Sequence, residues 1–166
     1  MSRPIIYPRP QWLREHAGEP FVISPSTPVI ASESVRPEAL HFRRWVHEEH
    51  GLDISLAPWP VHASPQPAIR VGLLAEEPVR EALEWHGLPP DGRELVHEGY
   101  LLDVRPEGVL VAGQDAAGAF YGLQLLRQIV AEQDGALCVG QVEANDWPYK
   151  PLRGVHMYMP PRAQLP

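Results

Sequence analysis

The chain has 166 residues and a formal net charge of −7, and 44% of its residues are hydrophobic. This length is enough for one domain with a buried core, and the apolar content predicts a folded chain. The negative charge argues against a nucleic-acid or anionic-membrane surface, because both need clustered lysine and arginine. No apolar run reaches the roughly 18 residues that a membrane-spanning helix requires.

The N-terminus does not have the pattern of a secretion signal. Residues 1–16 (MSRPIIYPRPQWLREH) lack the continuous apolar segment that signal peptides contain. A cytoplasmic protein is therefore the simplest interpretation, and a secreted protein whose signal had been removed would have the same sequence. Proline is frequent, with 20 residues, and most of them fall between the predicted elements. We therefore expect rigid loops.

The first third of the chain predicts short strands and one helix. The apolar runs 21–23 and 29–31 flank a turn rich in serine and proline, and each predicts a strand. A helix is predicted over 37–50, because proline suits its first turn and Gly51 suits its C-terminal end. A further strand is predicted over 52–56, followed by a proline-rich loop.

The central segment predicts a strand, a short helix and a β-hairpin. Residues 68–74 form a short apolar run between turn signals, which is typical of a buried strand. Residues 77–86 predict a helix that ends at Gly87. Alternating side chains, a turn that ends at Gly108 and a returning apolar run together predict a hairpin over 100–112.

The longest predicted helix follows the hairpin. Asp115 is a suitable N-cap, and apolar residues then recur at helical spacing as far as about Gln133. Gly118 and Gly122 lie one turn apart within this helix, and each glycine costs a helix about 1 kcal/mol relative to alanine. Two such costs predict that another backbone packs closely here. A closing strand is predicted over 137–142.

Strands and helices alternate along the chain, and at least one pair of strands is antiparallel. We therefore predict an α/β (α+β) fold, in which a mixed sheet carries two main helices on one face. The single cysteine, Cys138, lies in the apolar pattern of the closing strand, so we expect it to be a core residue.

Two residue patterns suggest chemistry, and each has a simpler explanation. His47 and His50 could face one metal ion from a helix, but zinc proteases place their histidines four residues apart in His-Glu-x-x-His. We therefore predict a solvated helix end at these histidines. The glutamates around residues 76–84 could act as paired catalytic carboxylates, but nothing in their segment indicates burial. We expect neither a metal nor a cofactor.

The C-terminal segment has the pattern of a second unit. Asp146-Trp147-Pro148 precedes Arg153-Gly154, and residues 155–159 predict a new strand with no partner after it. This order predicts a truncated second domain. Arg153 lies at the start of that strand, where its guanidinium could face a ligand. From the pattern alone, a surface arginine is an equally good interpretation.

The hairpin and helix resemble the end of the N-terminal accessory domain of glycoside hydrolase family 20, the β-N-acetylhexosaminidases. The family has a Tyr-x-Leu-x-Val strand, a turn at glycine, an apolar strand and a helix close to Ala-x-Gly-x-Phe-Tyr-Gly-x-Gln-x-Leu-x-Gln. The same order occurs here from Tyr100 to Gln128. The Asp-x-Pro at 146–148 and the Arg-Gly at 153–154 match the residues that precede and open the family's catalytic (β/α)8 barrel.

The resemblance implies a mixed sheet with helices on one face, similar to a zinc-protease fold but without zinc. It also implies that the full-length protein removes terminal β-linked N-acetylglucosamine or N-acetylgalactosamine with retention, using the substrate's own acetamido group as nucleophile. The Asp-Glu pair that assists this reaction belongs to a later barrel strand, outside this chain. One substrate-binding residue is implied here, Arg153, and no catalytic residue.

We therefore expect a non-catalytic domain over 1–150 and the start of a truncated barrel over 151–166, so that the fragment alone is inactive. Its expected partner is the barrel, which would bind the carbohydrate substrate. Tyr158 stands where family members commonly have aspartate, and Pro161 stands where they have arginine. These departures leave open which sugar is cleaved.

Two alternatives remain from the sequence. A free-standing carbohydrate-binding or interaction module would use exposed tryptophans, among them Trp12, Trp59 and Trp85, as a stacking platform. An accessory domain of another barrel glycosidase, such as an α-glucuronidase, would have a related order of elements. The sequence after Pro166 would discriminate among the three, because an Asp-Glu pair at the end of a later strand indicates the hexosaminidase.

Overall fold

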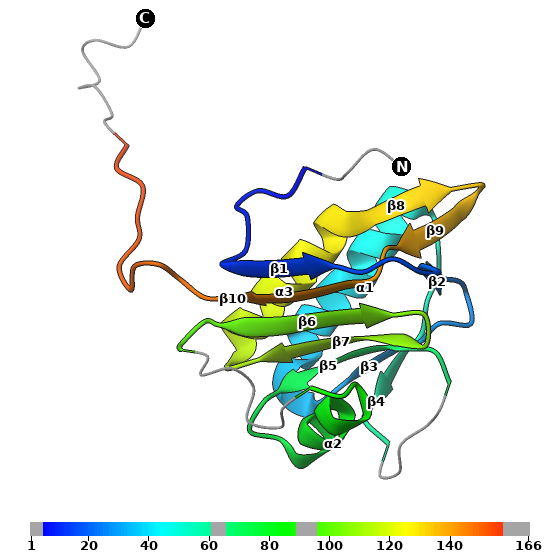
Figure 1. Ribbon diagram of the computed structural model, residues 1–166, viewed down its shortest axis with the longest axis horizontal. Coiled ribbons are helices and arrows are strands. Elements are labelled where there is room, and N and C mark those ends of the chain that lie inside the picture. Colours follow the sequence, from blue (N-terminus) through cyan, green and yellow to red (C-terminus); the bar gives the residue numbers. More distant parts are fainter. Residues whose placement is uncertain (1–4, 61–65, 89–95, 158–166) are drawn as a thin grey trace, which may run out of the picture.

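The computed structural model describes residues 5–60, 66–88 and 96–157. Its helices are α1 (Arg36–His50), α2 (Glu77–Trp85) and α3 (Ala116–Ile129), and a 3-10 turn, η1 (Glu33–Val35), precedes α1. Its strands are β1 (Trp12–Glu15), β2 (Phe21–Ile23), β3 (Val29–Ala31), β4 (Leu56–Pro58), β5 (Ile69–Leu73), β6 (Tyr100–Arg105), β7 (Gly108–Gly113), β8 (Val130–Gln133), β9 (Ala136–Val139) and β10 (Val142–Asp146). A seven-stranded mixed sheet has the order β1-β10-β6-β7-β5-β3-β4, and a three-stranded sheet has the order β2-β9-β8 (Figure 1).

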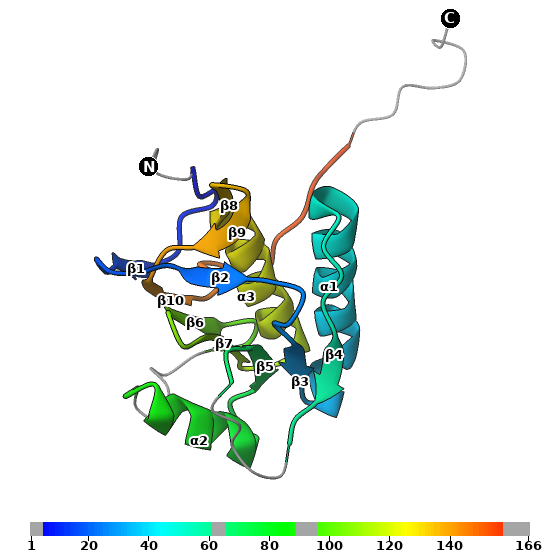
Figure 2. The same ribbon diagram turned by 90° about the vertical axis from the view of Figure 1, so that its right-hand side faces the viewer.

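Helices cover both faces of the large sheet. α1 and α3 pack on one face, and α2 packs on the other (Figure 2). Side chains alternate between these two layers along β6, because successive residues of a strand point to opposite faces. Leu102 joins the cluster beneath α1 and α3, whereas Leu101 joins the cluster beneath α2. The predicted mixed sheet with two main helices on one face is therefore confirmed.

The predicted strands at the centre of the sheet are present. β6 and β7 are antiparallel neighbours joined by a tight turn, with Leu102 opposite Val111. Beyond β7, the strands β5, β3 and β4 pair in parallel. Parallel strands that are covered on both faces are apolar along their whole length, which explains why every residue of β3 and β7 is buried.

α3 begins and packs as the sequence predicts. The side chain of Asp115 accepts a hydrogen bond from the N–H of Gly118 at 2.9 Å, as an N-cap does. A Cβ at Gly118 would collide with the carbonyl oxygen of Gly99, and a Cβ at Gly122 would lie 2.6 Å from the Val111 side chain. Both glycines let α3 lie directly against the hairpin, which confirms the predicted close packing.

The helix prediction is wrong at its C-terminal end. α3 ends at Ile129, and β8 pairs antiparallel with β9 where the helix was expected to continue to about Gln133. Asp134 and Gly135 join these two strands, and both have a positive φ, as a type I′ turn requires. The helical periodicity upstream concealed this second hairpin, although an Asp-Gly pair is itself a strong hairpin signal.

Four further strands differ from the prediction. The strand expected over 52–56 lies later, as β4, where its parallel pairing with β3 sets the register. The closing strand expected over 137–142 is two strands in different sheets, because β9 pairs with β2 while β10 pairs with β6. β1 was not predicted, since this edge strand reads Trp-Leu-Arg-Glu and has no buried residue to give it a clear periodicity.

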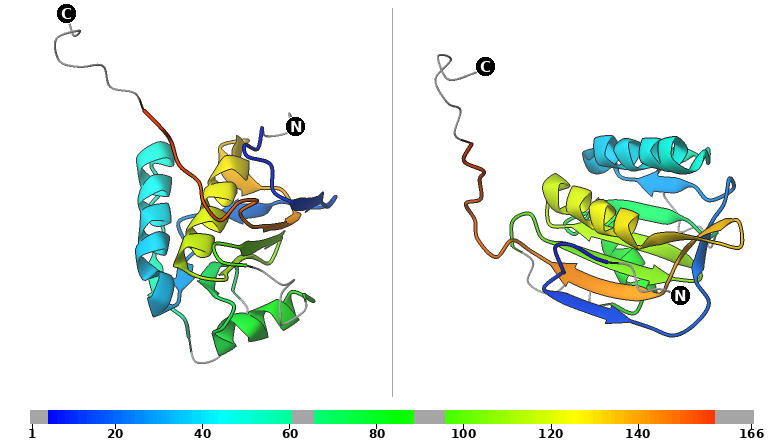
Figure 3. Two further views of the ribbon diagram at one scale, coloured as in Figure 1. Left: turned by 90° about the vertical axis from the view of Figure 1, so that its left-hand side faces the viewer. Right: turned by 90° about the horizontal axis from the view of Figure 1, so that it is seen from above.

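The chain leaves the sheet after β10. Residues 147–157 form neither helix nor strand, and the end of this segment leads away from the rest of the domain (Figures 1 and 3). The strand expected over 155–159 is therefore absent as far as residue 157. Its last two residues, including Tyr158, lie outside the described residues, as does Pro161.

Two further sequence features can be placed. Cys138 lies on β9 and is buried, as predicted for a core residue. None of the helices in the described part of the chain has the length and apolar content that crossing a membrane requires.

Candidate functional site

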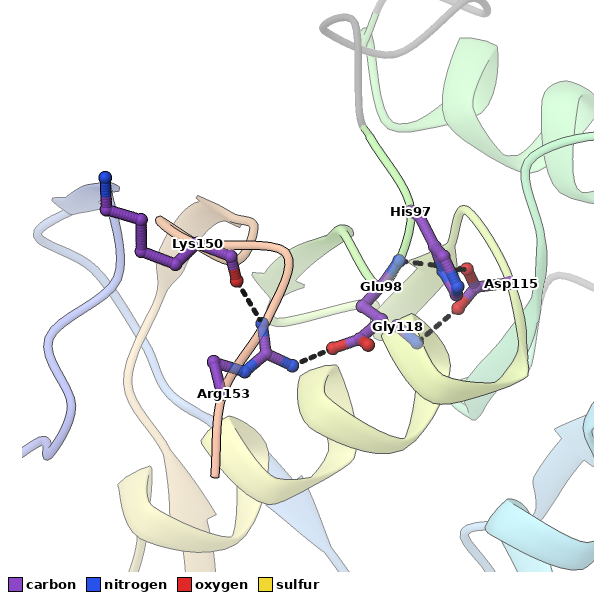
Figure 4. A network of polar contacts seen from close by, with 6 residues as sticks. All are labelled: His97, Glu98, Asp115, Gly118, Lys150 and Arg153. Atoms are coloured by element: carbon purple, nitrogen blue, oxygen red, sulfur yellow. Dashed lines mark hydrogen bonds and ion pairs between the residues drawn. The ribbon is translucent and has the colours of Figure 1, made fainter. Parts of the chain in front are cut away.

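Arg153 lies in the segment after β10 and is held there by two contacts. One of its terminal nitrogens, Nη2, donates to Glu98 Oε2, and the other, Nη1, donates to the carbonyl oxygen of Lys150 at 3.3 Å (Figure 4). The hydrogen bond that Arg153 donates to Glu98, together with the charge of that carboxylate, raises the pKa of the guanidinium above its ordinary value. The one site residue that the sequence indicated is thus engaged by a partner 55 positions earlier in the chain.

Glu98 is the side-chain partner of Arg153, and the sequence did not reveal this contact. Its φ of 65° lies in the left-handed region, and its N–H donates to Asp115 Oδ2 at 2.9 Å. Its side chain is 23% exposed and extends from the loop before β6 toward Arg153 (Figure 4). Glu98 and Arg153 are far apart in the sequence, so no local spacing pattern predicts their contact. The fold brings the two charges together.

Asp115 connects this pair to α3. Its Oδ1 accepts from the Gly118 N–H, while its Oδ2 accepts from the Glu98 N–H and also contacts Nδ1 of His97 (Figure 4). Burial alone would raise the pKa of this carboxyl, but the two backbone hydrogen bonds and His97 outweigh burial and lower the pKa below its ordinary value. An ionised Asp115 therefore fixes the backbone of Glu98 against the start of α3.

A groove of about 390 Å³ lies beside this network. It is formed by the N-terminal segment, the start of β6, one side of α3 and the segment after β10. Glu98 and Arg153 both line it, and so do four large aromatic side chains. These aromatic residues are Tyr100, Tyr121, Trp147 and Tyr149. The groove therefore combines flat apolar surface with a few charged groups, which is the composition of a binding surface.

Both carboxylates that line the groove already have partners. Glu98 holds Arg153, while Asp146 accepts from the Gln11 N–H at 3.1 Å and lies 3.5 Å from the Tyr100 hydroxyl. Burial, and then the neighbouring Asp146 carboxylate, raises the pKa of Tyr100, so this phenol stays protonated. These contacts position backbone and side chains and leave no arrangement typical of an acid–base pair across an open cleft.

His47 and His50 have separate contacts. Nδ1 of His47 lies 2.9 Å from Asp53 Oδ1, and His50 lies edge-on against the Trp45 ring. Among the described residues, no group of three or more His, Cys, Asp or Glu side chains is arranged to hold a metal ion. The two histidines therefore have the surroundings of a polar helix end.

The three tryptophans considered for a stacking platform lie in different elements. Trp12 is half-buried in β1, and Trp59 packs against the cluster beneath α2. Trp85, on α2, is 56% exposed, and the guanidinium of Arg70 lies 5.8 Å from its ring centroid. Only Trp85 of the three therefore presents a large exposed ring, and a cation lies over it.

The chemistry available to Arg153 is binding and orientation. A guanidinium has five N–H donors, of which Glu98 and the Lys150 carbonyl each engage one, and Tyr121 is a further hydrogen-bonding neighbour. The side chain remains 44% exposed, so the other donors can reach a ligand such as a pair of neighbouring hydroxyl groups. Arginine stays protonated at all physiological pH values, so it cannot serve as a general base.

A curated relative matches part of this chain. Over 58 residues, or 35% of its length, this chain is 45% identical to a beta-hexosaminidase of Vibrio vulnificus. That match covers 7% of the relative's own length.

Several solved structures share the fold. A chitobiase of Flavobacterium johnsoniae has a TM-score of 0.63 at 16% identity, over 87% of this chain and 21% of that one. A β-N-acetylhexosaminidase of Bacteroides fragilis has a TM-score of 0.58 at 22% identity, over 87% and 25%. CpGH84D, whose name carries a different family number, has a TM-score of 0.68 at 17% identity, over 89% and 24%. The chain spans a quarter or less of each of these proteins, and the likeness shows the fold alone.

A family model decides which family this domain belongs to. The model described as "Glycosyl hydrolase family 20, domain 2" matches residues 3–147. That range includes every helix and every strand of the described chain, from β1 to β10. The match confirms the resemblance seen in the hairpin and helix. The chain therefore belongs to the domain 2 family of glycosyl hydrolase family 20.

Proposed function

We propose that this chain is the N-terminal, non-catalytic domain of a β-N-acetylhexosaminidase-like glycoside hydrolase. The full-length protein hydrolyses terminal β-linked N-acetylglucosamine or N-acetylgalactosamine with retention, and the substrate's own acetamido group is the nucleophile. The observation that carries the proposal is the family match over residues 3–147. Relatives named as a beta-hexosaminidase and a β-N-acetylhexosaminidase support it.

The proposed domain boundary falls just after β10. Residues 1–150 form the accessory domain, and residues 151–166 begin the catalytic barrel. The family match ends at residue 147, and β10 is the last regular element among the described residues. Both observations support a connection, rather than further core, in the residues that follow.

The barrel is proposed to pack against the layer of α1 and α3. The segment after β10 lies on this side of the sheet, because Arg153 shares a groove with Tyr121 and Gln124 of α3. Leu40 on α1 and Tyr121 on α3 are large side chains that are 39% and 40% exposed. A second domain on this layer would cover them, and exposed apolar surface of this kind is typical of an interaction face.

Arg153 is the substrate contact that this chain would supply. Its exposed N–H donors suit the hydroxyl groups of a terminal sugar, and no charge on the sugar is needed for such contacts. The Asp-Glu pair that polarises the acetamide and protonates the leaving oxygen would come from the barrel. The accessory domain thus supplies support and one binding group.

The test compares two substrates with the protein extended through its following domain. One is an aryl β-N-acetylglucosaminide, and the other is the matched aryl β-glucoside, in which a hydroxyl replaces the acetamido group. Substrate-assisted hydrolysis predicts ready turnover of the first and little or none of the second. Equal turnover of both would contradict the mechanism, and turnover of neither would contradict the assignment to the hexosaminidases.

A further inference from the structure

We propose that Glu98 is a positioning residue, which fixes the guanidinium of Arg153 so that the accessory domain sets the geometry of a sugar-binding group at the start of the barrel. The inference rests on the proposed function in one respect, the role of Arg153 in binding the sugar. The contact between the two side chains stands on the structure itself.

The backbone of Glu98 is held in a conformation that glutamate rarely adopts. A φ of 65° is a left-handed conformation, which is unfavourable for a residue with a Cβ and persists only where the surroundings impose it. The surroundings here are the Asp115 carboxylate, which accepts the Glu98 N–H, and Gly99, whose N–H donates to the Val96 carbonyl at 2.8 Å. An observed outlier of this kind supports a functional hypothesis for the residue that carries it.

The Asp115 carboxylate that holds the Glu98 backbone is itself fixed by the packing of α3. Asp115 also caps α3 through Gly118, and Gly118 leaves no room for a Cβ against the Gly99 carbonyl. The backbone on both sides of Glu98 is therefore fixed by the helix that the hairpin carries. A carboxylate on such a backbone can hold a partner in one place, as positioning requires.

The contact leaves Arg153 able to bind a ligand. Glu98 and the Lys150 carbonyl each accept one N–H from a terminal nitrogen, and Tyr121 is a further hydrogen-bonding neighbour, but a guanidinium has five N–H donors and this side chain remains 44% exposed. Glu98 is only 23% exposed, so the pair is less screened by salt than two fully exposed charges would be. Glu98 thus orients the group without occupying all of it.

A simple tether would make the same contact, so the test must separate tethering from positioning. A tether only restrains the segment after β10, whereas a positioning residue also changes how well the sugar binds. The variant is Glu98→Ala, with Glu98→Gln as the conservative form that keeps an acceptor oxygen. Glu107→Ala is the matched control, because Glu107 is an exposed glutamate in the turn between β6 and β7.

The first readout is backbone relaxation by NMR on the 166-residue chain. We expect the amide order parameter of Arg153 to exceed about 0.6 in the parent protein and in Glu107→Ala. It should fall below about 0.6 in Glu98→Ala, while the amides of β6 and α3 stay near about 0.85. An Arg153 order parameter that is unchanged in Glu98→Ala would overturn the proposal, since Glu98 would then not hold the guanidinium.

The second readout is the kinetics of the extended protein on an aryl β-N-acetylglucosaminide. We expect Glu98→Ala to raise KM roughly tenfold with kcat within about twofold, because a misplaced binding group weakens sugar binding. Glu98→Gln should lie between the parent protein and Glu98→Ala. An unchanged KM in Glu98→Ala would overturn positioning. If the parent protein itself shows no hydrolysis, the proposed function fails, and the relaxation result alone still decides whether Glu98 orders Arg153.

Discussion

The hairpin with α3 and the segment after β10 are held by opposite means. In the first region, β7 is buried along its whole length and two glycines let a helix lie on the hairpin without a gap. In the second, Tyr149 and Leu152 are 81% and 90% exposed, and Arg153 makes polar contacts with Glu98 and the Lys150 carbonyl. Apolar burial is the dominant source of folding stability, so the first region stabilises the domain. The second can be reshaped by whatever packs on it.

The contrast also separates what each region contributes to function. The hairpin and α3 fix the backbone of Glu98 through Asp115. The segment after β10 provides the charged group, Arg153, but lacks regular structure of its own. The two regions meet at Glu98, because Asp115 accepts its N–H while its side chain accepts from Arg153.

The largest effect on stability is expected from a side chain at Gly118. A methyl group there would meet the Gly99 backbone, which cannot move aside as a flexible side chain can. We expect Gly118→Ala to lower the free energy of unfolding by about 3 kcal/mol or more, despite the better helix propensity of alanine. Urea unfolding followed by circular dichroism measures this.

Gly140→Ala is the matched control for this substitution. A Cβ at Gly140 meets no atom within 4 Å, and its φ is outside the positive range. We expect a change within about 0.5 kcal/mol. If the two alanine variants unfold at the same urea concentration, close packing of α3 on the hairpin is not what stabilises the domain.

A smaller effect is expected at the N-cap. Asp115→Ala removes the acceptor for the N–H groups of Gly118 and Glu98. N-cap losses cost about 1–2 kcal/mol, and we expect a value in that range from urea unfolding at neutral pH. The Arg153 amide should also become more mobile, because the backbone beneath Glu98 is released. A variant as stable as the parent protein would show that this network does not join the two regions.

The pH dependence of the same substitution has a definite sign. The folded protein lowers the pKa of Asp115 below its ordinary value of about 4. Its stabilising contribution is therefore fully present above that value and is lost as the pH falls through the folded pKa. The stability difference between the parent protein and Asp115→Ala should be largest near neutral pH and shrink below about pH 4. A difference that grows on acidification would contradict the lowered pKa.

The smallest effect is expected at His47. It pairs with Asp53 on the outside of the domain, and the two side chains are 59% and 90% exposed. Exposed ion pairs contribute between zero and about 1 kcal/mol, so we expect a coupling energy below about 0.5 kcal/mol in a double-mutant cycle with alanine. A coupling above about 1 kcal/mol would mean that this helix end is part of a larger network.

The sequence predicted the hairpin and α3 far better than the contact between Glu98 and the segment after β10. The hairpin, the Asp115 cap and the close approach at Gly118 all depend on residues near one another in the chain, so local periodicity and glycine spacing indicate them. β8 was not predicted, because the helical spacing of apolar residues in α3 continues into it. Only the Asp134-Gly135 turn indicates that a strand replaces the helix. β1 was not predicted, because an exposed edge strand carries a weak pattern.

The contact between Glu98 and Arg153 could not be predicted from the sequence. Arg153 was indicated by its place in a family pattern, whereas Glu98 has no motif and its left-handed φ is typical of glycine rather than glutamate. Its role depends on Asp115, 17 residues later, and on Arg153, 55 residues later. Contacts between residues so far apart in the sequence depend on how α3 packs on the hairpin. Local sequence patterns therefore cannot predict them.

The central claim is that this domain has a supporting, non-catalytic role, and we propose that the hydrolytic chemistry lies in a catalytic barrel of the full-length protein. The most direct measurement compares the 166-residue chain with the extended protein for hydrolysis of an aryl β-N-acetylglucosaminide. We predict release of the aryl alcohol by the extended protein and none above the buffer rate by the 166-residue chain. Turnover by the 166-residue chain that is abolished by Glu98→Gln or Asp146→Asn would contradict the account.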